Sequence, residues 1–365
     1  MLLLGFHSQV PSPELREAYR QVRPRLGKAM FHDYGFWQAV KADCPGIKLI
    51  GRLFDEWATH AMDEPIKAGR SWADRQYADP CFRDLYDYPE WLNEVFGYTN
   101  PDRWEWMDIA QEAFVDRWRE LDPTKIPIAG NCGNGNLWGE EWTTFLPRTV
   151  KAARLFGFHA YGYPTMKASA DYWVLRYRQV MGKIREVNPA ALAIITEAGI
   201  THMVIPGYPD RGYLDEQTPE QYWDTGGLRW LNDRLLEDGY GIAPGGYMLG
   251  ATVFQIGGSA TPPPEPDGWA SFEGLGTSII DRMAALSPGT PSIEIGEDTI
   301  MPDYTFEGDF ARFAEENPRL KLTPTSEAVY LSEDRAVQLA NKGALVYVPG
   351  ERTTLHKPYR PRPKV

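Results

Sequence analysis

Short apolar runs alternate with longer stretches of helical periodicity over most of this 365-residue chain. A short apolar run bounded by turn residues is typical of a buried strand, and apolar residues that recur every three or four positions are typical of a helix. The runs predict eight strands, at residues 2–9, 28–32, 47–54, 85–94, 126–130, 156–161, 191–197 and 246–255. Because strands and helical stretches alternate, the pattern predicts a parallel sheet whose strands are joined by helices.

The helical stretches lie between these strands. The clearest covers residues 103–121, where Trp106, Ile109, Phe114 and Trp118 recur at helical spacing. A helix is also expected after Ser12-Pro13, because proline favours the first turn of a helix. Further helices are predicted at 144–155, 171–188, 219–238 and 271–286, and the charged segment 63–86 predicts one helix with loops.

Eight strand–helix units within residues 1–287 predict an α/β fold, the (β/α)8 TIM barrel. In that fold every strand delivers its C-terminal residues to one face of the barrel. Polar residues stand at the predicted strand ends, namely His7, His32, Arg52, Glu94, Asn131, His159, Glu197 and Gln255. A doubly wound open sheet is the alternative, but no Gly-rich phosphate-binding sequence follows the first strand.

Composition and charge narrow the classes of function. The net charge of −12 and the sequence pI of about 5.1 argue against nucleic-acid binding and against an anionic membrane surface. Aromatic residues make up 13% of the chain, which fits stacking on sugars and equally fits a core anchored by aromatics. Neither a transmembrane run nor a basic leader is visible. Secretion, action at a bacterial cell envelope and the oligomeric state all stay open.

Two glutamates end apolar runs in the fourth and seventh strand–helix units. Glu94 closes the sequence Trp-Leu-Asn-Glu, and Glu197 closes Ile-Ile-Thr-Glu. Hydrolysis of a glycosidic bond needs one carboxyl group that is protonated near neutral pH and a second that is ionised. Either glutamate alone is typical of a surface position or a helix start. Because both end strands of one predicted barrel, the pair predicts two catalytic carboxyl groups that face each other.

With a third motif, this pair resembles the clan A, cellulase-like retaining glycoside hydrolases. The resemblance spans roughly residues 2–286 and rests on Asn93-Glu94 after strand four, His159-Ala160-Tyr161 after strand six and Glu197 after strand seven. It implies that Glu94 is the acid/base and Glu197 the nucleophile of a double displacement on a β-linked glycan. It also implies that Asn93 holds the sugar 2-hydroxyl, that Tyr161 hydrogen-bonds the nucleophile, and that His159 lines the substrate cleft.

Two strand ends depart from that family. Many members carry an arginine after strand two, where this chain has His32, and the nearest arginine is Arg52 in strand three. Many place a tryptophan after strand eight, where this chain has Phe254-Gln255. Phe254 is therefore a candidate sugar platform, as are Trp138 and Trp142, although both tryptophans also suit packing. The candidate substrate-binding residues are Asn93, His159, Tyr161, His32, Arg52, Asn131, Trp138, Phe254 and Gln255.

No cofactor and no metal are predicted. His7 and His32 end neighbouring strands, but no matching carboxylate pattern accompanies them. The three cysteines, Cys44, Cys81 and Cys132, are odd in number and widely spaced, which fits neither a disulfide framework nor a zinc site.

The C-terminal part carries a second resemblance. Residues 288–304 are rich in Pro, Gly and Ser and predict a linker, and residues 305–365 predict a small lobe and tail with a short helix at 306–316. Segments 324–327, 336–338 and 342–347 resemble one copy of the LGFP-type repeats of bacterial envelope proteins, which implies a cell-wall glycan. Two alternative functions remain: a phage-type or autolytic peptidoglycan lysin that uses the same carboxylates, and a non-catalytic carbohydrate-binding barrel.

Overall fold

The computed structural model describes two compact units, Met1–Glu294 and Ile295–Val365. The described residues are 1–54, 64–94, 101–133, 136–202, 212–215, 217–257, 272–288, 293, 295 and the four strands of the second unit. The predicted helix at 306–316 and almost all of the predicted linker 288–304 lie outside the described residues.

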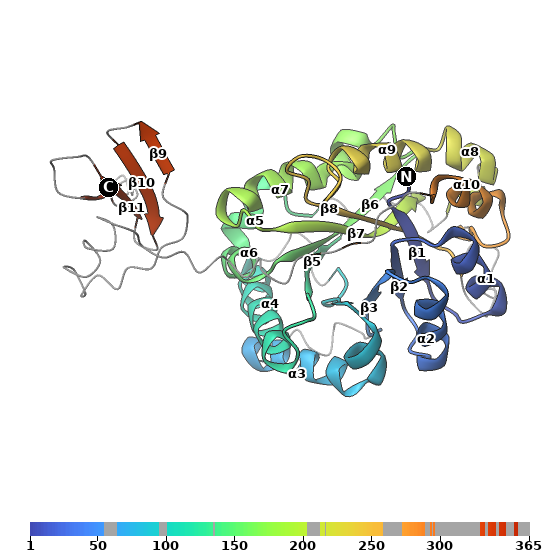
Figure 1. Ribbon diagram of the computed structural model, residues 1–365, viewed down its shortest axis with the longest axis horizontal. Coiled ribbons are helices and arrows are strands. Elements are labelled where there is room, and N and C mark those ends of the chain that lie inside the picture. The colour runs from blue at the N-terminus through green and yellow to red at the C-terminus, as the bar shows by residue number, and fades with distance from the viewer. Residues whose placement is uncertain are drawn as a thin grey trace. The chain divides into compact units, whose positions relative to one another are not determined.

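Eight parallel strands form the first unit (Figure 1). They are β1 (Leu4–Ser8), β2 (Leu26–Ala29), β3 (Lys48–Gly51), β4 (Tyr88–Pro89), β5 (Ile128–Cys132), β6 (Leu155–Gly162), β7 (Leu192–Ile200) and β8 (Met248–Val253). Their order is β4-β3-β2-β1-β8-β7-β6-β5. A parallel bridge between Glu90 and Ile128 joins the two edges, and the N–H of Trp91 donates to the carbonyl of Ile128 at 3.1 Å. The predicted (β/α)8 barrel is confirmed.

Helices connect the strands and surround them in Figure 1. They are α1 (Pro13–Val22), α2 (Tyr34–Asp43), α3 (Pro65–Ala78), α4 (Pro101–Leu121), α5 (Gly139–Phe145), α6 (Pro147–Ala152), α7 (Arg176–Val187), α8 (Pro219–Asp224), α9 (Leu228–Glu237) and α10 (Ser278–Leu286). Short helical turns occur at η2 (Cys81–Leu85), η3 (Ala170–Val174) and η5 (Tyr213–Asp215). As predicted, α1 begins after Ser12, whose side chain accepts a hydrogen bond from the N–H of Leu15.

Two predicted helices are each divided in the structure. The segment 219–238 forms α8 and α9, because Gly227 adopts a φ of 112° that only glycine tolerates easily and so interrupts the helix. The segment 144–155 contains the end of α5 and all of α6, which meet at Leu146 and Pro147. Proline has no N–H for the preceding helix and instead starts the next one.

A register shift between β6 and β7 positions two consecutive side chains. Phe158 pairs with Ile195, but the next residue, His159, pairs with Glu197, so Thr196 is an extra residue in β7. Such a bulge interrupts the alternation of side chains along a strand. Thr196 and Glu197 accordingly both contact side chains of other strands.

A second shift lies in β5, between Gly130 and Cys132. Here Asn131 has a φ of 48°, and its side chain is fully buried. Gly157 on β6 leaves the room that this side chain occupies, because a Cβ on that glycine would lie 1.9 Å from Asn131 Oδ1. The bulge and the glycine together place a polar amide inside the barrel.

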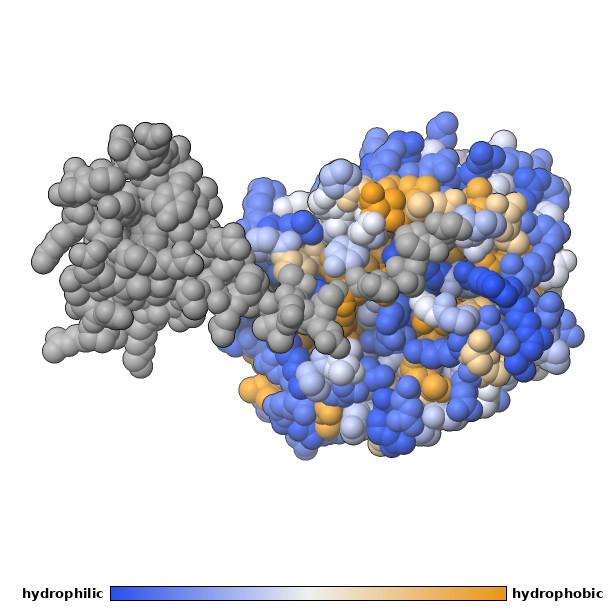
Figure 2. Space-filling view, viewed as in Figure 1, coloured by the Kyte–Doolittle hydropathy of each residue, from blue (hydrophilic) through white to orange (hydrophobic). Residues whose placement is uncertain are grey.

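The main apolar core contains residues of both the strands and the helices. Its largest fully buried side chains include Trp37, Trp72, Trp91, Trp104, Trp118 and Trp142. Packing therefore accounts for much of the aromatic content, Trp142 included. On the face drawn in Figure 2, hydrophilic residues cover most of the coloured surface and hydrophobic residues form separate patches. Cys44, Cys81 and Cys132 are buried free thiols.

The second unit contains an antiparallel sheet. Its strands are β9 (Val329–Ser332), β10 (Arg335–Ala340), β11 (Gly343–Tyr347) and β12 (Thr354–His356), in the order β12-β11-β10-β9. Across the described parts of both units, no helix has the length and apolar character needed to span a bilayer.

Two helical glycines should respond oppositely to replacement by alanine. A Cβ on Gly69 in α3 would lie 2.1 Å from the carbonyl oxygen of Ala110 in α4, whereas no described atom lies within 4 Å of a Cβ on Gly182 in α7. Alanine favours a helix over glycine by about 1 kcal/mol, so Gly182→Ala should raise the free energy of unfolding. Gly69→Ala should lower it by about 1–3 kcal/mol through overpacking. Urea denaturation measures both, and equal stabilisation would contradict the close α3–α4 contact.

Candidate active site

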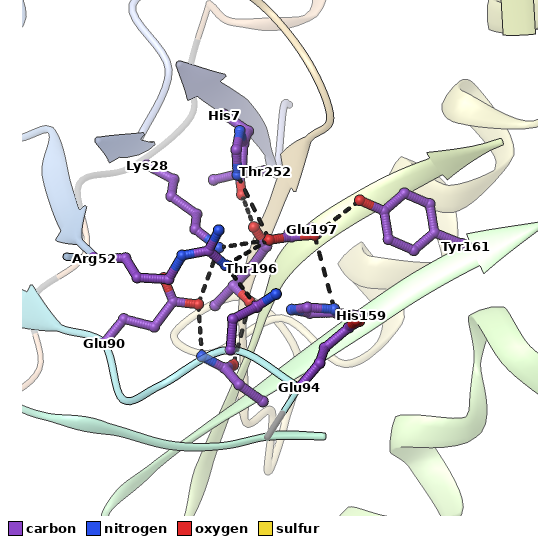
Figure 3. A network of polar contacts seen from close by, with 12 residues as sticks. His7, Lys28, Arg52, Glu90, Glu94, His159, Tyr161, Thr196, Glu197 and Thr252 are labelled. Atoms are coloured by element: carbon purple, nitrogen blue, oxygen red, sulfur yellow. Dashed lines mark hydrogen bonds and ion pairs between the residues drawn. The ribbon is translucent and has the colours of Figure 1, made fainter. Parts of the chain in front are cut away.

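Glu197 lies at the centre of a buried polar network inside the barrel (Figure 3). Its oxygen Oε1 accepts hydrogen bonds from Lys28 Nζ at 3.1 Å and from Arg52 Nη1 at 2.8 Å. His7 Nε2 lies 3.6 Å from the same oxygen. Lys28 is on β2, Arg52 directly follows β3 and His7 is on β1, so three neighbouring strands direct nitrogen atoms at one oxygen.

The second oxygen of Glu197 faces β6. The hydroxyl of Tyr161 donates a hydrogen bond to Oε2 at 2.9 Å, and His159 Nδ1 lies 3.8 Å from it. Figure 3 shows these two side chains on one side of Glu197, with Lys28 and Arg52 on the other. The contact between Tyr161 and Glu197 is the one that the family resemblance implies.

The surroundings of Glu197 keep its carboxyl group ionised. Burial by itself would raise its pKa, because only 6% of the residue is exposed. His159, Lys28, His7 and Arg52 together outweigh burial and hold the pKa of Glu197 well below its usual value. Glu197 is therefore a carboxylate at neutral pH.

Glu94 reaches the same network from the segment that follows β4. Its φ of 45° is uncommon for a residue other than glycine, and its N–H donates to the carbonyl of Asn131 at 2.9 Å. Its carboxylate oxygen Oε1 lies 2.5 Å from His159 Nδ1. The Glu94 side chain is 38% exposed, against 8% for Glu197. One carboxyl group thus faces solvent, and the other is enclosed by the barrel.

A single histidine nitrogen bounds the distance between the two carboxyl groups. His159 Nδ1 lies 2.5 Å from Glu94 Oε1 and 3.8 Å from Glu197 Oε2. These two oxygens therefore cannot be further apart than the sum of the two distances. The structure therefore brings the two predicted carboxyl groups together.

The two histidines of the site have opposite protonation behaviour. Burial lowers the pKa of His159, but the negative charges of Glu197 and Glu94 more than reverse this and leave the pKa raised. Burial dominates at His7 and lowers its pKa to about 4, although Glu197 opposes the shift. His7 is therefore neutral at pH 7, while His159 is biased toward the protonated form.

Two charged residues that were not predicted from the sequence, Lys28 and Glu90, belong to the same buried network as Glu197. Lys28 Nζ donates to Glu90 Oε1 at 3.0 Å as well as to Glu197, and both Lys28 and Glu90 are fully buried. Lysine and glutamate are almost never fully buried unless they are paired. A charged residue within an otherwise apolar strand run was the signal available in the sequence, at Lys28 on β2 and at Glu90 just after β4.

Two further predicted residues, Asn93 and Phe254, contact side chains that surround Glu197. Arg52 Nη1 also donates to Asn93 Oδ1 at 2.5 Å, so Asn93 is held beside the carboxyl pair. The ring of Phe254 packs edge-on against His7, with 4.8 Å between ring centroids, and against Tyr161, with 6.0 Å. Phe254 is joined to the buried residue Gln255 by a cis peptide bond.

Asn131, another predicted substrate-binding residue, is fully buried. Its amide nitrogen donates to Glu90 Oε1 at 2.6 Å, and its oxygen accepts from the hydroxyl of Thr196 at 3.3 Å. The register shift in β5 turns this side chain into the barrel interior. Asn131 therefore holds Glu90 in the buried network, and its predicted contact with substrate stays a prediction.

The described contacts of His32 and Trp138 do not include either carboxyl group. His32 Nδ1 lies 3.2 Å from the hydroxyl of Tyr86, and β2 ends at Ala29, three residues before His32. Trp138 precedes α5 and packs against the ring of Tyr172, with 5.1 Å between centroids. The Arg176 guanidinium lies over the Trp138 ring. Their predicted contacts with substrate stay predictions.

Among the described side chains, no group of three or more His, Cys, Asp or Glu residues is arranged to hold a metal ion. The polar side chains around Glu197 are mainly cations and hydrogen-bond donors. Such an arrangement suits an anion and opposes a metal ion.

The structure is similar to several solved structures at low sequence identity. The monomeric beta-xylosidase from Caulobacter crescentus CB15 gives a TM-score of 0.52 at 12% identity, over 93% of this chain and 73% of its own. The GH39 enzyme from Xanthomonas axonopodis pv. citri gives 0.53 at 12% identity, over 95% of this chain and 71% of its own. A GH2 beta-galacturonidase from Eisenbergiella tayi gives 0.51 at 12% identity, over 80% of this chain and 52% of its own.

These likenesses, at 12% identity, establish the fold as the (β/α)8 barrel. The chain spans about half the length of the beta-galacturonidase. No protein-family model and no curated protein matches this chain. The resemblance of the C-terminal segments to LGFP-type repeats is therefore without support from these comparisons.

Replacing Glu197 should change the titration of His159. Because the charge of Glu197 helps to raise the pKa of His159, the variant Glu197→Gln should lower that pKa. NMR titration of histidine-labelled protein measures the shift. His32, whose ring contacts Tyr86, is the internal control and should titrate as in the unaltered protein. An unchanged His159 would show that Glu197 does not act on it.

Proposed function

We propose that this chain is a retaining glycoside hydrolase of the clan A type that cleaves β-glycosidic bonds in a poly- or oligosaccharide. Glu197 is the nucleophile, and Glu94 is the acid/base. The observation that supports this most directly is the position of His159 Nδ1 between the two carboxylates, at 2.5 Å from Glu94 and 3.8 Å from Glu197. One carboxyl group is surrounded by cations and the other faces solvent.

The different surroundings of the two carboxyl groups match the two roles that the reaction requires, nucleophile and acid/base. A retaining glycosidase needs an ionised carboxylate to attack the anomeric carbon and a second carboxyl group that exchanges a proton with the leaving group and then with water. Lys28, Arg52 and Tyr161 keep Glu197 ionised and oriented. Glu94 is exposed enough to meet a glycosidic oxygen and a water molecule. The shared contact with His159 holds the two carboxyl groups close together, as retention requires, for which a separation of about 5–5.5 Å is typical.

In the first step Glu197 attacks the anomeric carbon of the bound sugar. Its oxygen Oε2 lies on the side of Tyr161, His159 and Glu94, whereas Oε1 is held by Lys28 and Arg52. As the new C–O bond forms, the glycosidic C–O bond breaks, and the protonated carboxyl of Glu94 gives its proton to the leaving oxygen. The product of this step is a glycosyl ester of Glu197.

In the second step water releases the sugar. The Glu94 carboxylate takes a proton from water as the water oxygen attacks the anomeric carbon, and the ester bond to Glu197 breaks. Glu94 is then protonated and Glu197 is ionised again, so the cycle closes. The configuration at the anomeric carbon is inverted twice and is therefore retained.

The substrate-binding roles follow from the contacts around the pair. Asn93, held by Arg52 at 2.5 Å, is placed to bind the sugar 2-hydroxyl. Arg52 supplies from β3 the guanidinium that related enzymes carry after strand two, so the position of His32 does not leave the nucleophile without an arginine. Phe254 stands at the strand-eight position of the tryptophan platform, beside His7 and Tyr161, with 4% of the residue exposed.

The similar structures support the same class of reaction and leave the sugar open. Two of the proteins compared above are described as a beta-xylosidase and a beta-galacturonidase, which names two different β-linked sugars. A peptidoglycan lysin would use the same two carboxylates, but the C-terminal resemblance that suggested a cell-wall glycan lacks support. A substrate panel is therefore the experiment that assigns the sugar.

Two substitutions separate the proposed roles of the glutamates. With aryl β-glycosides of xylose, glucose, glucuronic acid and galacturonic acid as substrates, Glu197→Gln should reduce kcat to background. Glu94→Gln should reduce kcat/KM by about 10²–10⁴-fold for poor leaving groups and far less for dinitrophenol, which leaves without a proton. Glu14→Gln, an exposed change on α1, is the matched control.

The outcomes of this panel also decide between the alternatives. Full activity of the Glu197→Gln variant would contradict the assignment of Glu197 as the nucleophile. Sugar binding without turnover of any glycoside by the unaltered protein would favour a non-catalytic barrel. Clearing of a cell-wall suspension without hydrolysis of the aryl glycosides would favour a lysin.

The stereochemistry of hydrolysis provides a second prediction. A β-glycoside that the protein cleaves should first release the β-anomer, because two displacements retain the configuration. Proton NMR of the reaction in its first minutes distinguishes the anomers before they equilibrate. Initial release of the α-anomer would show inversion, in which one carboxylate activates water directly.

A further inference from the structure

We infer that Lys28 and Glu90 form a buried ion pair that positions the nucleophile and sets how strongly its charge is held. The two residues do not touch the substrate site, and they act through Glu197. The inference rests on the proposed role of Glu197 as nucleophile. It adds two positioning residues to a site otherwise built from strand-end motifs.

The geometry links three side chains through one ammonium group. Lys28 Nζ lies 3.0 Å from Glu90 Oε1 and 3.1 Å from Glu197 Oε1. The side chains of Lys28 and Glu90 are 0% exposed, and that of Glu197 is 8% exposed. Because a lysine ammonium has three N–H donors, it can serve both carboxylates at once. Figure 3 shows Lys28 and Glu90 together on one side of Glu197.

Glu90 is itself fixed by a chain of hydrogen bonds that returns to the nucleophile strand. Asn131 Nδ2 donates to Glu90 Oε1 at 2.6 Å, and the hydroxyl of Thr196 donates to Asn131 Oδ1 at 3.3 Å. Thr196 directly precedes Glu197 on β7. The contacts of Lys28, Glu90, Asn131 and Thr196 therefore form a ring that starts at Glu197 and returns to the residue before it, through β2, the residue after β4, β5 and β7.

This ring matters because the charge of Glu197 changes during the proposed reaction. Glu197 is an anion before attack and a neutral ester afterwards, so Lys28 loses one of its two counter-charges in the glycosyl-enzyme. Glu90 remains ionised beside it and keeps the buried ammonium paired, which avoids an uncompensated charge in the interior. Without Glu90, Lys28 would bind only Glu197, stabilise its anionic form and weaken it as a nucleophile.

Removal of either member of the pair should shift the titration of Glu197 in opposite directions. The charged and titratable groups that face Glu197 are His7 on β1, Lys28 on β2, Arg52 after β3, His159 and Tyr161 on β6, and Glu94 through His159. Loss of the Lys28 charge should raise the pKa of Glu197, because Lys28 is one of the groups that lower it. Loss of the Glu90 charge should lower it further, because Lys28 is then shared with no other carboxylate.

The test compares Lys28→Met, Glu90→Gln and the double variant with the unaltered protein. The acidic limb of the pH profile of kcat/KM should move to higher pH in Lys28→Met, to lower pH in Glu90→Gln, and back toward the starting position in the double variant. We expect kcat to fall by about tenfold or more in each single variant with KM changed little, as for a group that acts through the nucleophile. Lys28→Arg keeps the charge and should keep the acidic limb.

A second readout does not depend on activity. Carbon NMR of glutamate labelled at the side-chain carboxyl follows the titration of Glu197 directly, with its signal assigned by loss in Glu197→Gln. If no glycoside is hydrolysed, the proposed function fails, yet this titration still shows whether Lys28 and Glu90 act on Glu197. If the folded variants show neither a shift in the titration of Glu197 nor a shift of the acidic limb, Lys28 and Glu90 have only a structural role. That outcome would overturn the inference.

The double variant also covers the case in which a single variant does not fold, because it leaves no unpaired buried charge. If Lys28→Met is unfolded, the step from Glu90→Gln to the double variant removes the same lysine and should move the acidic limb to higher pH. If both single variants are unfolded, the double variant should still lose kcat with KM retained. A double variant with the kcat of the unaltered protein would overturn the inference.

Discussion

The buried negative charge of Glu197 is the constraint on which the rest of the site depends. An isolated carboxylate at this depth would be neutralised by a raised pKa, because transfer of a charge from water to the protein interior is strongly unfavourable. The barrel prevents this by directing Lys28 and Arg52 at the same oxygen, 3.1 Å and 2.8 Å away. These cations need counter-charges of their own, which explains why Glu90 is present although it lies too deep to meet a substrate.

The barrel is suited to this arrangement because each strand adds one side chain to a common interior. The groups around Glu197 come from β1, β2, the end of β3 and β6, so no single segment of the chain contains the site. Regular alternation of side chains along each strand would not by itself bring all of these groups to the site. The extra residue in β7 turns both Thr196 and Glu197 toward other strands, and the shift in β5 does the same for Asn131. The irregular positions of the sheet are thus the ones that join its polar network.

The sequence predicts the barrel and the carboxyl pair for different reasons. Eight apolar runs separated by helical stretches are enough to define the fold, and Glu94, Glu197 and Tyr161 follow from motifs at strand ends. Lys28 and Glu90 are harder to predict, because a charged residue in a strand faces either the core or the solvent depending on a register that shifts by single residues. His32 shows the same limit, since β2 ends at Ala29, three residues before the predicted strand end at His32, whose ring contacts Tyr86.

The position of each glutamate relative to its strand explains why Glu197 and Glu94 have different surroundings. Glu197 lies within β7, three residues before its end at Ile200, whereas Glu94 lies beyond the last residue of β4 and has a positive φ. The first is therefore enclosed and needs fixed cations, and the second keeps contact with solvent and with a single histidine. A proton can leave and return to Glu94 through water without a change in the buried network. Because the same His159 nitrogen lies near both groups, the site joins an enclosed carboxylate, held ionised by fixed cations, to a solvent-exposed carboxyl group within a short distance.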